Sequence, residues 1–410
     1  MGKTNPELVK IRDAINKQFG FNVSRIASEV DNWMTERIST GSVSLDIILG
    51  GGIPVGRMIH VSGMESSSKS MMAYLTGSKF QERRKKKILW EKYCTPGKPI
   101  YRELLLPVGS KEGDPLKVAL IQFETHSYAN DWAQKIGLNI DELIFVQPAS
   151  LEEGLDVAIK LQEMGVELII VDSYAAAKPG LILETESQDK YQLGIKQIKL
   201  DDFHGRWQAL NNKADREGRI PTTLFAINQR REKIGFNLGD PTYAPGGKSK
   251  DFTAAIDLIL RQGDNLTIGS GTNKFTIGRI VHARTKKNKT YAPAKTTSWD
   301  LYFDEGGPVP AGKIDNAKSI VLEAVAFEII NKKGSWFAYK GKNLAQGAEA
   351  TIELIRKDNK LFEEIREKLM EVAFEEERKE EEELKKLALE KKVAAPKAKK
   401  KTLTRRSSKK

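Results

Sequence analysis

The sequence predicts an α/β fold with a mostly parallel central sheet. Three observations predict it: short apolar runs alternate with segments of helical periodicity, a turn of small residues joins one run to the next helix, and single polar residues close several runs. Strands that are connected through helices lie parallel in one sheet, and the helices then cover it. Sheets of this kind bind ligands beyond the carboxyl ends of their strands.

The elements are expected in a simple order. Residues 6–19 form an amphipathic helix with Leu8, Ile11, Ile15 and Phe19 on one stripe, which ends at Gly20 and stands apart as an amino-terminal element. Strands are expected at 58–62, 118–123, 143–147, 168–172 and 222–227, and helices at 70–81, 151–165 and 198–218. Strands at 257–262, 276–283 and 298–303 are expected to extend the sheet in antiparallel fashion, and 316–372 is predicted as a helical region that forms a small domain.

Composition excludes several classes of protein. The chain has 410 residues, 40% of them hydrophobic, which allows one large domain with a smaller one appended, or two or three domains. The single cysteine, Cys94, excludes an internal disulfide, and with four scattered histidines it makes no metal-ligand cluster. The amino terminus lacks a signal-peptide pattern and no long apolar run occurs, so we expect a cytoplasmic protein without a membrane span.

The net charge of +12 is concentrated at the carboxyl end. Ten Lys or Arg residues and no acidic residue lie between Lys391 and Lys410, which leaves +2 for the other 390 residues. This tail is predicted to be disordered, and it is either a polybasic arm for nucleic-acid phosphates or a solubilising terminus. Before it, residues 375–392 have the composition of a solvated helix, with Glu three or four positions ahead of Lys.

The turn of small residues from Gly63 to Ser70 has the composition of a phosphate-binding loop. Small residues let consecutive backbone N–H groups converge on a phosphate, Lys69 adds a charge, and Ser70 offers a hydroxyl to Mg²⁺. The pattern G-x-x-x-x-G-K-[ST] is met except that Ser68 replaces the second glycine, and the alternative is a Ser-rich surface loop. The candidate nucleotide-binding residues here are Gly63, Glu65, Ser66, Ser67, Ser68, Lys69 and Ser70.

Three polar residues end apolar runs and are expected near this loop. Asp172 closes ELIIVD, Glu124 closes VALIQFE, and Gln229 follows LFAIN. Asp172 would hold the magnesium shell, Glu124 would orient and deprotonate an attacking water, and Gln229 would sense the γ-phosphate. Each residue alone could instead be a helix cap or a turn residue. Together with the loop, they predict a nucleoside triphosphatase.

The motifs, in order, resemble the RecA recombinase family from near the amino terminus to about Val372. They are STGSVSLDIILGGGIPVGR, GMESSSKS, LIIVDS, FAINQRREKIGFNLGDP, PGGKSKDF, KKNKTYAP and KGSWFAYKGKNLAQG. The resemblance implies a P-loop RecA-like ATPase core over 37–312, an amino-terminal helix and strand over 1–36 that dock on the neighbouring subunit, and a small α/β domain over 313–373. A charged helix and basic tail follow over 374–410.

The resemblance also implies roles for individual residues. Lys69, Ser70, Asp172, Glu124 and Gln229 keep the roles given above, with ATP and Mg²⁺ as cofactors. Trp132 lies where the family has an adenine-stacking tyrosine, and its alternative is a helix residue packed into the core. Lys287 and Lys289 match lysines that reach ATP bound by the adjacent subunit, although on sequence alone they form a basic loop.

The DNA-binding segments are likewise implied by the resemblance. Residues 184–194 correspond to the first DNA loop of the family and residues 230–247 to the second. Cations and aromatic residues on a glycine-rich loop suit single-stranded DNA, and Gln229 at its base would link ATP to loop order. The candidate DNA-binding residues are Arg230, Arg231, Lys233, Phe236, Gly246, Gly247 and Lys248.

Several features depart from the family. Ser68 replaces a glycine, Met64 replaces a proline, and Leu238 stands where bacterial relatives commonly have a phenylalanine. An insertion at about 83–115 begins RRKKK and contains Trp90, Tyr93 and Tyr101. It is either an accessory site for DNA or a partner, or a surface decoration.

The function predicted is an ATP-dependent recombinase. It would coat single-stranded DNA as a helical homo-oligomeric filament, pair it with homologous duplex DNA, and hydrolyse ATP to recycle, with single-strand-binding and mediator proteins as further partners. The alternatives are a catalytically weak filament or accessory protein, motivated by Ser68, and a ring-forming helicase motor. A bacterial cell or a phage-infected host both suit the sequence.

Overall fold

The computed structural model describes residues 5–27, 36–91, 94, 98–124, 129–180, 191–232, 242–244 and 249–374. The chain divides into two compact units between Leu322 and Glu323. Within the described ranges, no helix is long and apolar enough to cross a membrane. Predictions for Lys233, Phe236, Gly246, Gly247 and Lys248, for most of the first DNA loop, and for the segment after residue 374 lie outside the described residues.

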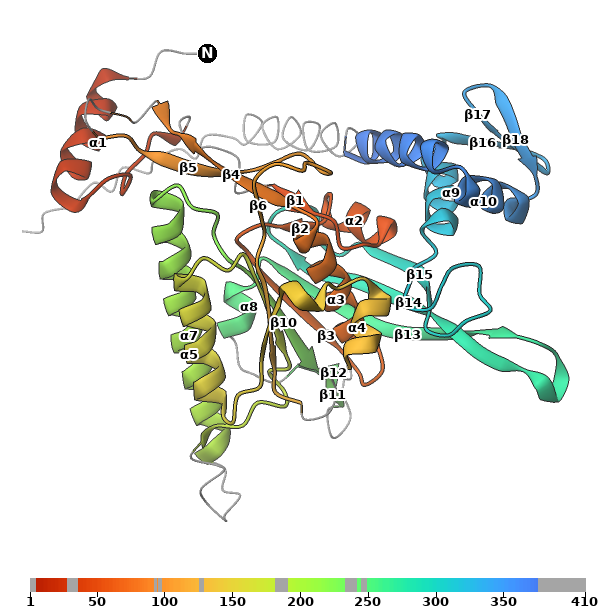
Figure 1. Cartoon of the computed structure of the whole chain (residues 1–410), viewed down its shortest axis with the longest axis horizontal. Coiled ribbons are helices and arrows are strands. Elements are labelled where there is room, and N and C mark those ends of the chain that lie inside the picture. Colours follow the sequence, from red (N-terminus) through yellow and green to blue (C-terminus); the bar gives the residue numbers. More distant parts are fainter. Residues whose placement is uncertain are drawn as a thin grey trace, which may run out of the picture. The chain divides into compact units, whose positions relative to one another are not determined.

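The first unit is built on an eight-stranded sheet with the order β15-β14-β13-β3-β10-β9-β7-β8 (Figure 1). The six strands from β13 to β8 run parallel to one another. At the other end of the sheet, β14 runs antiparallel to β13, and β15 runs antiparallel to β14. The fold class predicted from the sequence is therefore confirmed. The strands are β3 Met58–Gly63, β7 Val118–Gln122, β8 Leu143–Val146, β9 Leu168–Asp172, β10 Thr223–Gln229, β13 Ile256–Ile268, β14 Phe275–Asn288 and β15 Thr296–Tyr302.

One strand was assigned the wrong direction by the sequence prediction. The region 257–262 was expected to begin the antiparallel extension, but β13 runs parallel to β3, and only β14 reverses. The short helix α8 (Ser249–Thr253) precedes β13, and β13 pairs with the edge of β3 in the parallel sense, with Ile256 opposite Ile59.

The helices begin and end at recognisable capping residues. In α1 (Pro6–Phe19), Asn5 accepts a hydrogen bond from Glu7 N, and in α5 (Leu151–Glu163) Ser150 accepts one from Glu153 N. Gly137 ends α4 (Asn130–Ile136) in the left-handed conformation. The remaining helices of this unit are α2 Val43–Leu49, α3 Lys69–Gln81 and α7 Tyr191–Arg216.

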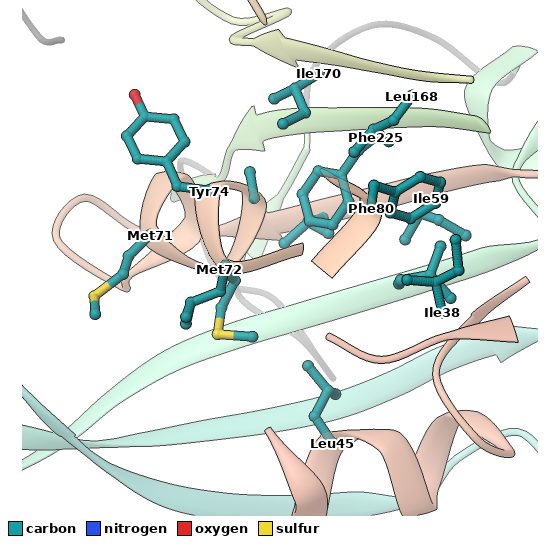
Figure 2. Close-up of a cluster of buried hydrophobic side chains, with 14 of the residues drawn as sticks. Ile38, Leu45, Ile59, Met71, Met72, Tyr74, Phe80, Leu168, Ile170 and Phe225 are labelled. Carbon is teal, nitrogen blue, oxygen red and sulfur yellow. The ribbon is translucent and has the colours of Figure 1, made fainter. Parts of the chain in front are cut away.

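Both faces of the sheet are buried, as the continuous apolar strands require. Alternate residues face opposite sides: Ile59 and Val61 belong to a cluster with α2 and α3, whereas Met58 belongs to a cluster with α5 and α7. Figure 2 shows part of the first cluster, in which Phe80 of α3 lies near Ile59 and Phe225 of neighbouring strands. This packing fixes the strand ends that carry the candidate site.

The insertion forms a small sheet of its own. Its strands β4 (Arg84–Leu89), β5 (Tyr101–Leu105) and β6 (Asp114–Pro115) pair antiparallel in the order β5-β4-β6. Two further two-stranded pairs join β1 (Arg37–Ile38) to β2 (Ile53–Pro54) and β11 (Arg231–Glu232) to β12 (Thr242–Tyr243).

The second unit mixes helices with an antiparallel sheet. It contains the end of α9 (Asn316–Ala326), then β16 (Ile330–Lys333), β17 (Trp336–Tyr339), β18 (Lys342–Gln346) and α10 (Ala348–Lys357), and residues 359–374 are helical. The prediction of a helical region over 316–372 was therefore wrong for the stretch that holds β16 to β18, whereas the α/β domain implied by the family resemblance is confirmed. Gly334 and Gly341, both with positive φ, lie in the turns that join β16 to β17 and β17 to β18, and the prediction from sequence periodicity did not identify these turns.

Candidate nucleotide-binding site

The phosphate-binding turn lies between β3 and α3. A Cβ at Gly63 would collide with Ser67 Oγ and the carbonyl of Leu260, so this position needs glycine. Ser66 and Ser68 both have positive φ, at 58° and 65°. Left-handed backbone costs a residue with a Cβ ~1 kcal/mol, so Ser68 keeps the shape of the missing glycine at a conformational cost.

Lys69 is buried in the turn, and within the part of the chain that the structure describes its ammonium donates to neutral oxygens. Its ammonium donates to the carbonyl of Met64 at 2.6 Å and to Ser67 Oγ at 3.3 Å. Burial lowers the pKa of Lys69, against the opposing effect of three nearby carboxylates, Asp172, Glu124 and Glu65. A buried cation whose charge is not fully balanced is a favourable place for a phosphate.

Asp172 closes β9 beside this turn and is 3% exposed. Burial raises its pKa to about 6; the charge of Glu124 also raises it, while a hydrogen bond with the Ser70 side chain and the charge of Lys69 lower it. The hydroxyl of Ser70 and the carboxylate of Asp172 are oxygen donors, and Mg²⁺ is held by few protein oxygens together with water and substrate phosphates. These two residues fit a magnesium ion that accompanies a bound nucleotide.

Glu124 follows β7 and is held from two sides. Its Oε1 accepts hydrogen bonds from Gln229 Nε2 at 3.1 Å and from Ser173 Oγ at 3.2 Å. The backbone of Phe123 donates to Asp172 O at 2.7 Å, which sets the end of β7 beside the end of β9. The structure thus brings Glu124, Gln229 and the Asp172 backbone together beside the phosphate-binding turn.

The first residues of the segment predicted as the second DNA loop are bonded to this site. Arg230 N donates to Gly63 O at 3.0 Å, so the chain leaves β10 in direct contact with the phosphate-binding turn. Arg231 is exposed and pairs with Tyr243 in the β11–β12 ladder. Arg230 and Arg231 therefore begin a hairpin whose base touches the nucleotide site.

Lys287 and Lys289 lie at the end of β14 and contact α8. Lys289 Nζ donates to Phe252 O at 2.8 Å, and Lys287 Nζ donates to Asp251 O. Burial and the neighbouring ammonium of Lys289 lower the pKa of Lys287. Within the described part of the chain, both ammonium groups bind carbonyls at the carboxyl end of a short helix, not the phosphate-binding turn of their own subunit.

Comparison with known proteins identifies the family. Residues 7–90 and 109–307 match the model of the RecA N-terminal domain, and residues 319–373 match that of the RecA C-terminal domain. The chain belongs to the RecA family. It is 32% identical over 357 residues to "Protein RecA, chromosomal" of Lactococcus lactis subsp. lactis (strain IL1403), covering 87% of this chain and 80% of that relative.

A second relative gives the same result. "Protein RecA" of Chlamydia abortus (strain DSM 27085 / S26/3) is 31% identical over 364 residues, which cover 88% of this chain and 90% of the relative. The resemblance predicted from the motifs is confirmed. The RecA N-terminal match omits residues 91–108, which belong to the insertion and include β5.

Trp132 lies in α4 of this RecA-family core. It is partly buried and packs against the apolar cluster between the sheet and α3, next to the fully buried Ala133. Part of its indole therefore serves the core, as the alternative reading held. Its stacking on adenine stays a prediction.

Arg279 is a site residue that the sequence reasoning missed. It lies on β14, and its Nη1 donates to the carbonyl of Ser66 in the phosphate-binding turn at 2.6 Å. Its guanidinium carbon also lies 5.2 Å from the centre of the Phe303 ring. No motif contains Arg279, and only the pairing of β14 beside β13 and β3 brings it to the turn.

A charge network centred on the buried His60 and Asp257 crosses the sheet near the site. His60 Nδ1 lies 2.9 Å from Asp257 Oδ1, and Lys286 Nζ lies 3.2 Å from Asp257 Oδ2. Burial acts to raise the pKa of Asp257, but the hydrogen bond and charge of His60 and the charge of Lys286 outweigh it and lower the pKa to about 2. Asn228 Nδ2, beside Gln229, lies 3.3 Å from His60 Nε2.

Proposed function

We propose that this RecA-family protein is a DNA-dependent ATPase that forms helical filaments on single-stranded DNA and catalyses homologous pairing and strand exchange in DNA repair. One observation carries the proposal: Gln229, at the end of β10, bonds Glu124 through its side chain, while the next residue, Arg230, bonds the phosphate-binding turn through its backbone. The candidate base, the phosphate sensor and the start of a DNA loop are therefore mechanically joined.

In this proposal the chain binds ATP through the backbone of the turn and the ammonium of Lys69. Magnesium, bound with the nucleotide near Ser70 and Asp172, would supply charge neutralisation on the phosphates. Glu124 orients the attacking water and accepts its proton. Gln229 exchanges its bond to Glu124 for one to the γ-phosphate, which shifts Arg230 and orders the following DNA loop.

Assembly into filaments would use surfaces of two kinds. The apolar stripe of α1 is exposed, with Leu8 48%, Ile11 57% and Phe19 65% accessible, and would dock on a second copy of the chain. Lys287 and Lys289 would leave their α8 carbonyls and approach the nucleotide of the adjacent subunit. Hydrolysis would then depend on assembly, because a neighbour supplies charge to the phosphates.

Homologous duplex DNA, single-strand-binding protein and mediator proteins are the partners that a recombinase of this kind requires. We propose a bacterial cytoplasm or a phage-infected host cell as its setting.

The decisive experiment is ATP hydrolysis by the purified protein with and without single-stranded DNA, at two salt concentrations. DNA should stimulate the wild-type rate, and Glu124→Gln should lower it about 100- to 10,000-fold while DNA binding persists. Glu142→Gln, an exposed glutamate after α4, is the matched control. Normal hydrolysis by Glu124→Gln would show that another group is the base.

A catalytically weak filament protein is the second candidate, favoured by the left-handed Ser68. Wild-type protein that binds DNA but hydrolyses ATP only at background would support it. Electron microscopy with ATP and single-stranded DNA tests the ring-forming motor, because closed rings without filaments would contradict the filament proposal.

A further inference from the structure

The insertion sheet is anchored in the core by buried charges. Lys85 of β4 forms an ion pair with Glu167, whose side chain is 1% exposed, and lies 3.4 Å from Glu103 of β5. Glu167 also accepts a hydrogen bond from Lys117 N at 2.7 Å. Burial acts to lower the pKa of Lys85, but the charges and hydrogen bonds of Glu167 and Glu103 outweigh it and raise the pKa. The insertion sheet is therefore fixed to the core.

A second set of contacts fixes the insertion to the end of α7. Glu103 N donates to Gly218 O at 2.6 Å, and Ile220 N donates to Glu103 Oε2 at 3.1 Å. Gly218 has a φ of 70°, and a Cβ there would lie 2.8 Å from Tyr101 O. The backbone at Gly218 therefore approaches the backbone of β5 closely. β5 thus rests directly on the turn that follows α7.

The turn after α1 rests on the same region. Asn22 is 2% exposed and its Nδ2 donates to Arg216 O at 3.4 Å, and Arg25 forms an ion pair with Asp215. The edge of Phe21 meets the ring of Trp90, with centroids 6.2 Å apart and planes at 90°. Trp90, directly after β4, is 6% exposed, and its backbone N–H donates to Ile100 O at 2.6 Å.

Helix α1 is rigidly tied to this turn but buries nothing itself. Asn16 Nδ2 donates to Ser24 O at 3.0 Å, and Ser24 N donates to Asn16 Oδ1 at 2.8 Å. No residue of α1 is buried. The turn is therefore the part of the amino-terminal element that fixes its orientation.

The basic run that opens the insertion is engaged by groups of the insertion and of the core. Lys86 pairs with Glu112 at 3.2 Å, and Lys87 lies 5.3 Å from the centre of the Tyr101 ring. Arg83 and Arg84 donate to the carbonyls of Leu106 and Gly113. With Lys85 in its buried ion pairs, the run is used for folding, which favours a structural role over a DNA site.

We propose that the insertion sheet is a brace for the amino-terminal element. Trp90 holds Phe21, the end of α7 holds Asn22 and Arg25, and α1 is presented with its apolar stripe outward to a second copy of the chain. The brace rests on the proposed filament function, and it gives a role to a sheet of which the RecA family match leaves out residues 91–108, among them β5 and Ile100, the backbone partner of Trp90.

Hydrogen–deuterium exchange of the nucleotide-free, DNA-free full chain tests the brace. Phe21→Ala removes the contact from its exposed side and leaves Trp90 in place, and Trp90→Ala removes it from the other side. Both should accelerate exchange about tenfold at the amides of residues 6–24, because these open without the brace. Lys86→Ala, on the same strand and exposed, is the control and should exchange as wild type does.

Assembly on single-stranded DNA completes the test. Phe21→Ala should raise the protein concentration needed for filaments about tenfold and leave binding of a fluorescent ATP analogue unchanged. Unchanged exchange in both variants would overturn the brace, and so would faster exchange with unaltered assembly. Loss of DNA binding in a Lys86→Ala, Lys87→Ala variant would favour a nucleic-acid site instead. A wild-type protein that never assembles would contradict the proposed function. The exchange experiment would still test the brace, because it does not require assembly.

Discussion

Two lysines whose side chains are largely removed from solvent, Lys85 and Lys69, have different electrostatic surroundings. Lys85, in the insertion, has Glu167 and Glu103 as ion-pair partners, and its pKa is raised. Lys69, in the phosphate-binding turn, donates hydrogen bonds to the neutral oxygens of Met64 and Ser67, and burial lowers its pKa. The insertion lysine has carboxylate partners within the chain, whereas the lysine of the turn is the one we propose to contact the phosphates of a nucleotide.

Two buried aspartates repeat the contrast. Burial acts to raise the pKa of both, but His60 and Lys286 reverse its effect at Asp257, whose pKa falls to about 2. At Asp172 burial prevails and the pKa rises to about 6. Balanced buried charges indicate structure, and unbalanced ones indicate a site for a charged ligand. The difference separates the parts of this protein that hold the fold from those that hold a nucleotide.

The largest effect is expected from breaking the balanced pair. Lys85→Met should lower the free energy of unfolding by about 3–5 kcal/mol, because it leaves the Glu167 carboxylate buried without its cation. Chemical denaturation measures the loss. Lys86→Met, one residue away and exposed, should change stability by less than ~0.5 kcal/mol. Equal effects of the two changes would show that the Lys85 pair does not anchor the insertion.

The unbalanced lysine should behave in the opposite way. Lys69→Met should lower affinity for a fluorescent ATP analogue about 100- to 1,000-fold, because a charge aimed at the phosphates is lost. The nucleotide-free protein should unfold at the same or a higher denaturant concentration, since a buried cation without a carboxylate partner is removed. Lys79→Met, on the exposed side of α3, is the control. A large loss of stability in Lys69→Met would contradict the comparison.

The balanced aspartate predicts a pH dependence of stability. The pKa of Asp257 in the folded chain lies below its ordinary value of 3.8, so its contribution is present above pH ~4 and is lost as the pH falls through about 2. Asp257→Asn should therefore cost ~2 kcal/mol at pH 7, and this difference should shrink between pH 4 and pH 2. Urea titrations at several pH values measure it, with the exposed Asp264→Asn as control. A pH-independent difference would exclude the charge pair as its origin.

The smallest effect concerns the shape of the phosphate-binding turn. Arg279 holds the carbonyl of Ser66 while Ser68 occupies a left-handed corner. A glycine at position 68 adopts the left-handed conformation without strain, so the turn then depends less on the hydrogen bond from Arg279. Arg279→Gln should therefore weaken nucleotide binding more in the wild type than in the Ser68→Gly background, by about 1 kcal/mol. A double-mutant cycle on nucleotide affinity gives this coupling energy. Additive effects would show that Arg279 does not support the turn.

Much of the nucleotide end of the molecule could be predicted because its signals are local in sequence. The apolar runs, the turn of small residues and the polar strand ends each occupy a few consecutive positions, and parallel strands place their carboxyl ends together. The helix over 6–19 was likewise predictable from its stripe of apolar residues and from Gly20, which ends it. The errors fell where local patterns are ambiguous: the direction of β13 and the three short strands after α9.

By itself, then, the sequence determined the α/β class, the phosphate-binding turn and the identity of Lys69, Asp172, Glu124 and Gln229 as candidates. Only the tertiary structure decided which charges are balanced. Lys85 and Glu167 are 82 residues apart, and Arg279 and Ser66 are 213 apart, so no periodicity or spacing joins them. Burial and ion pairing depend on neighbours in space, and those are set by the order of strands in the sheet and by how the insertion packs on it.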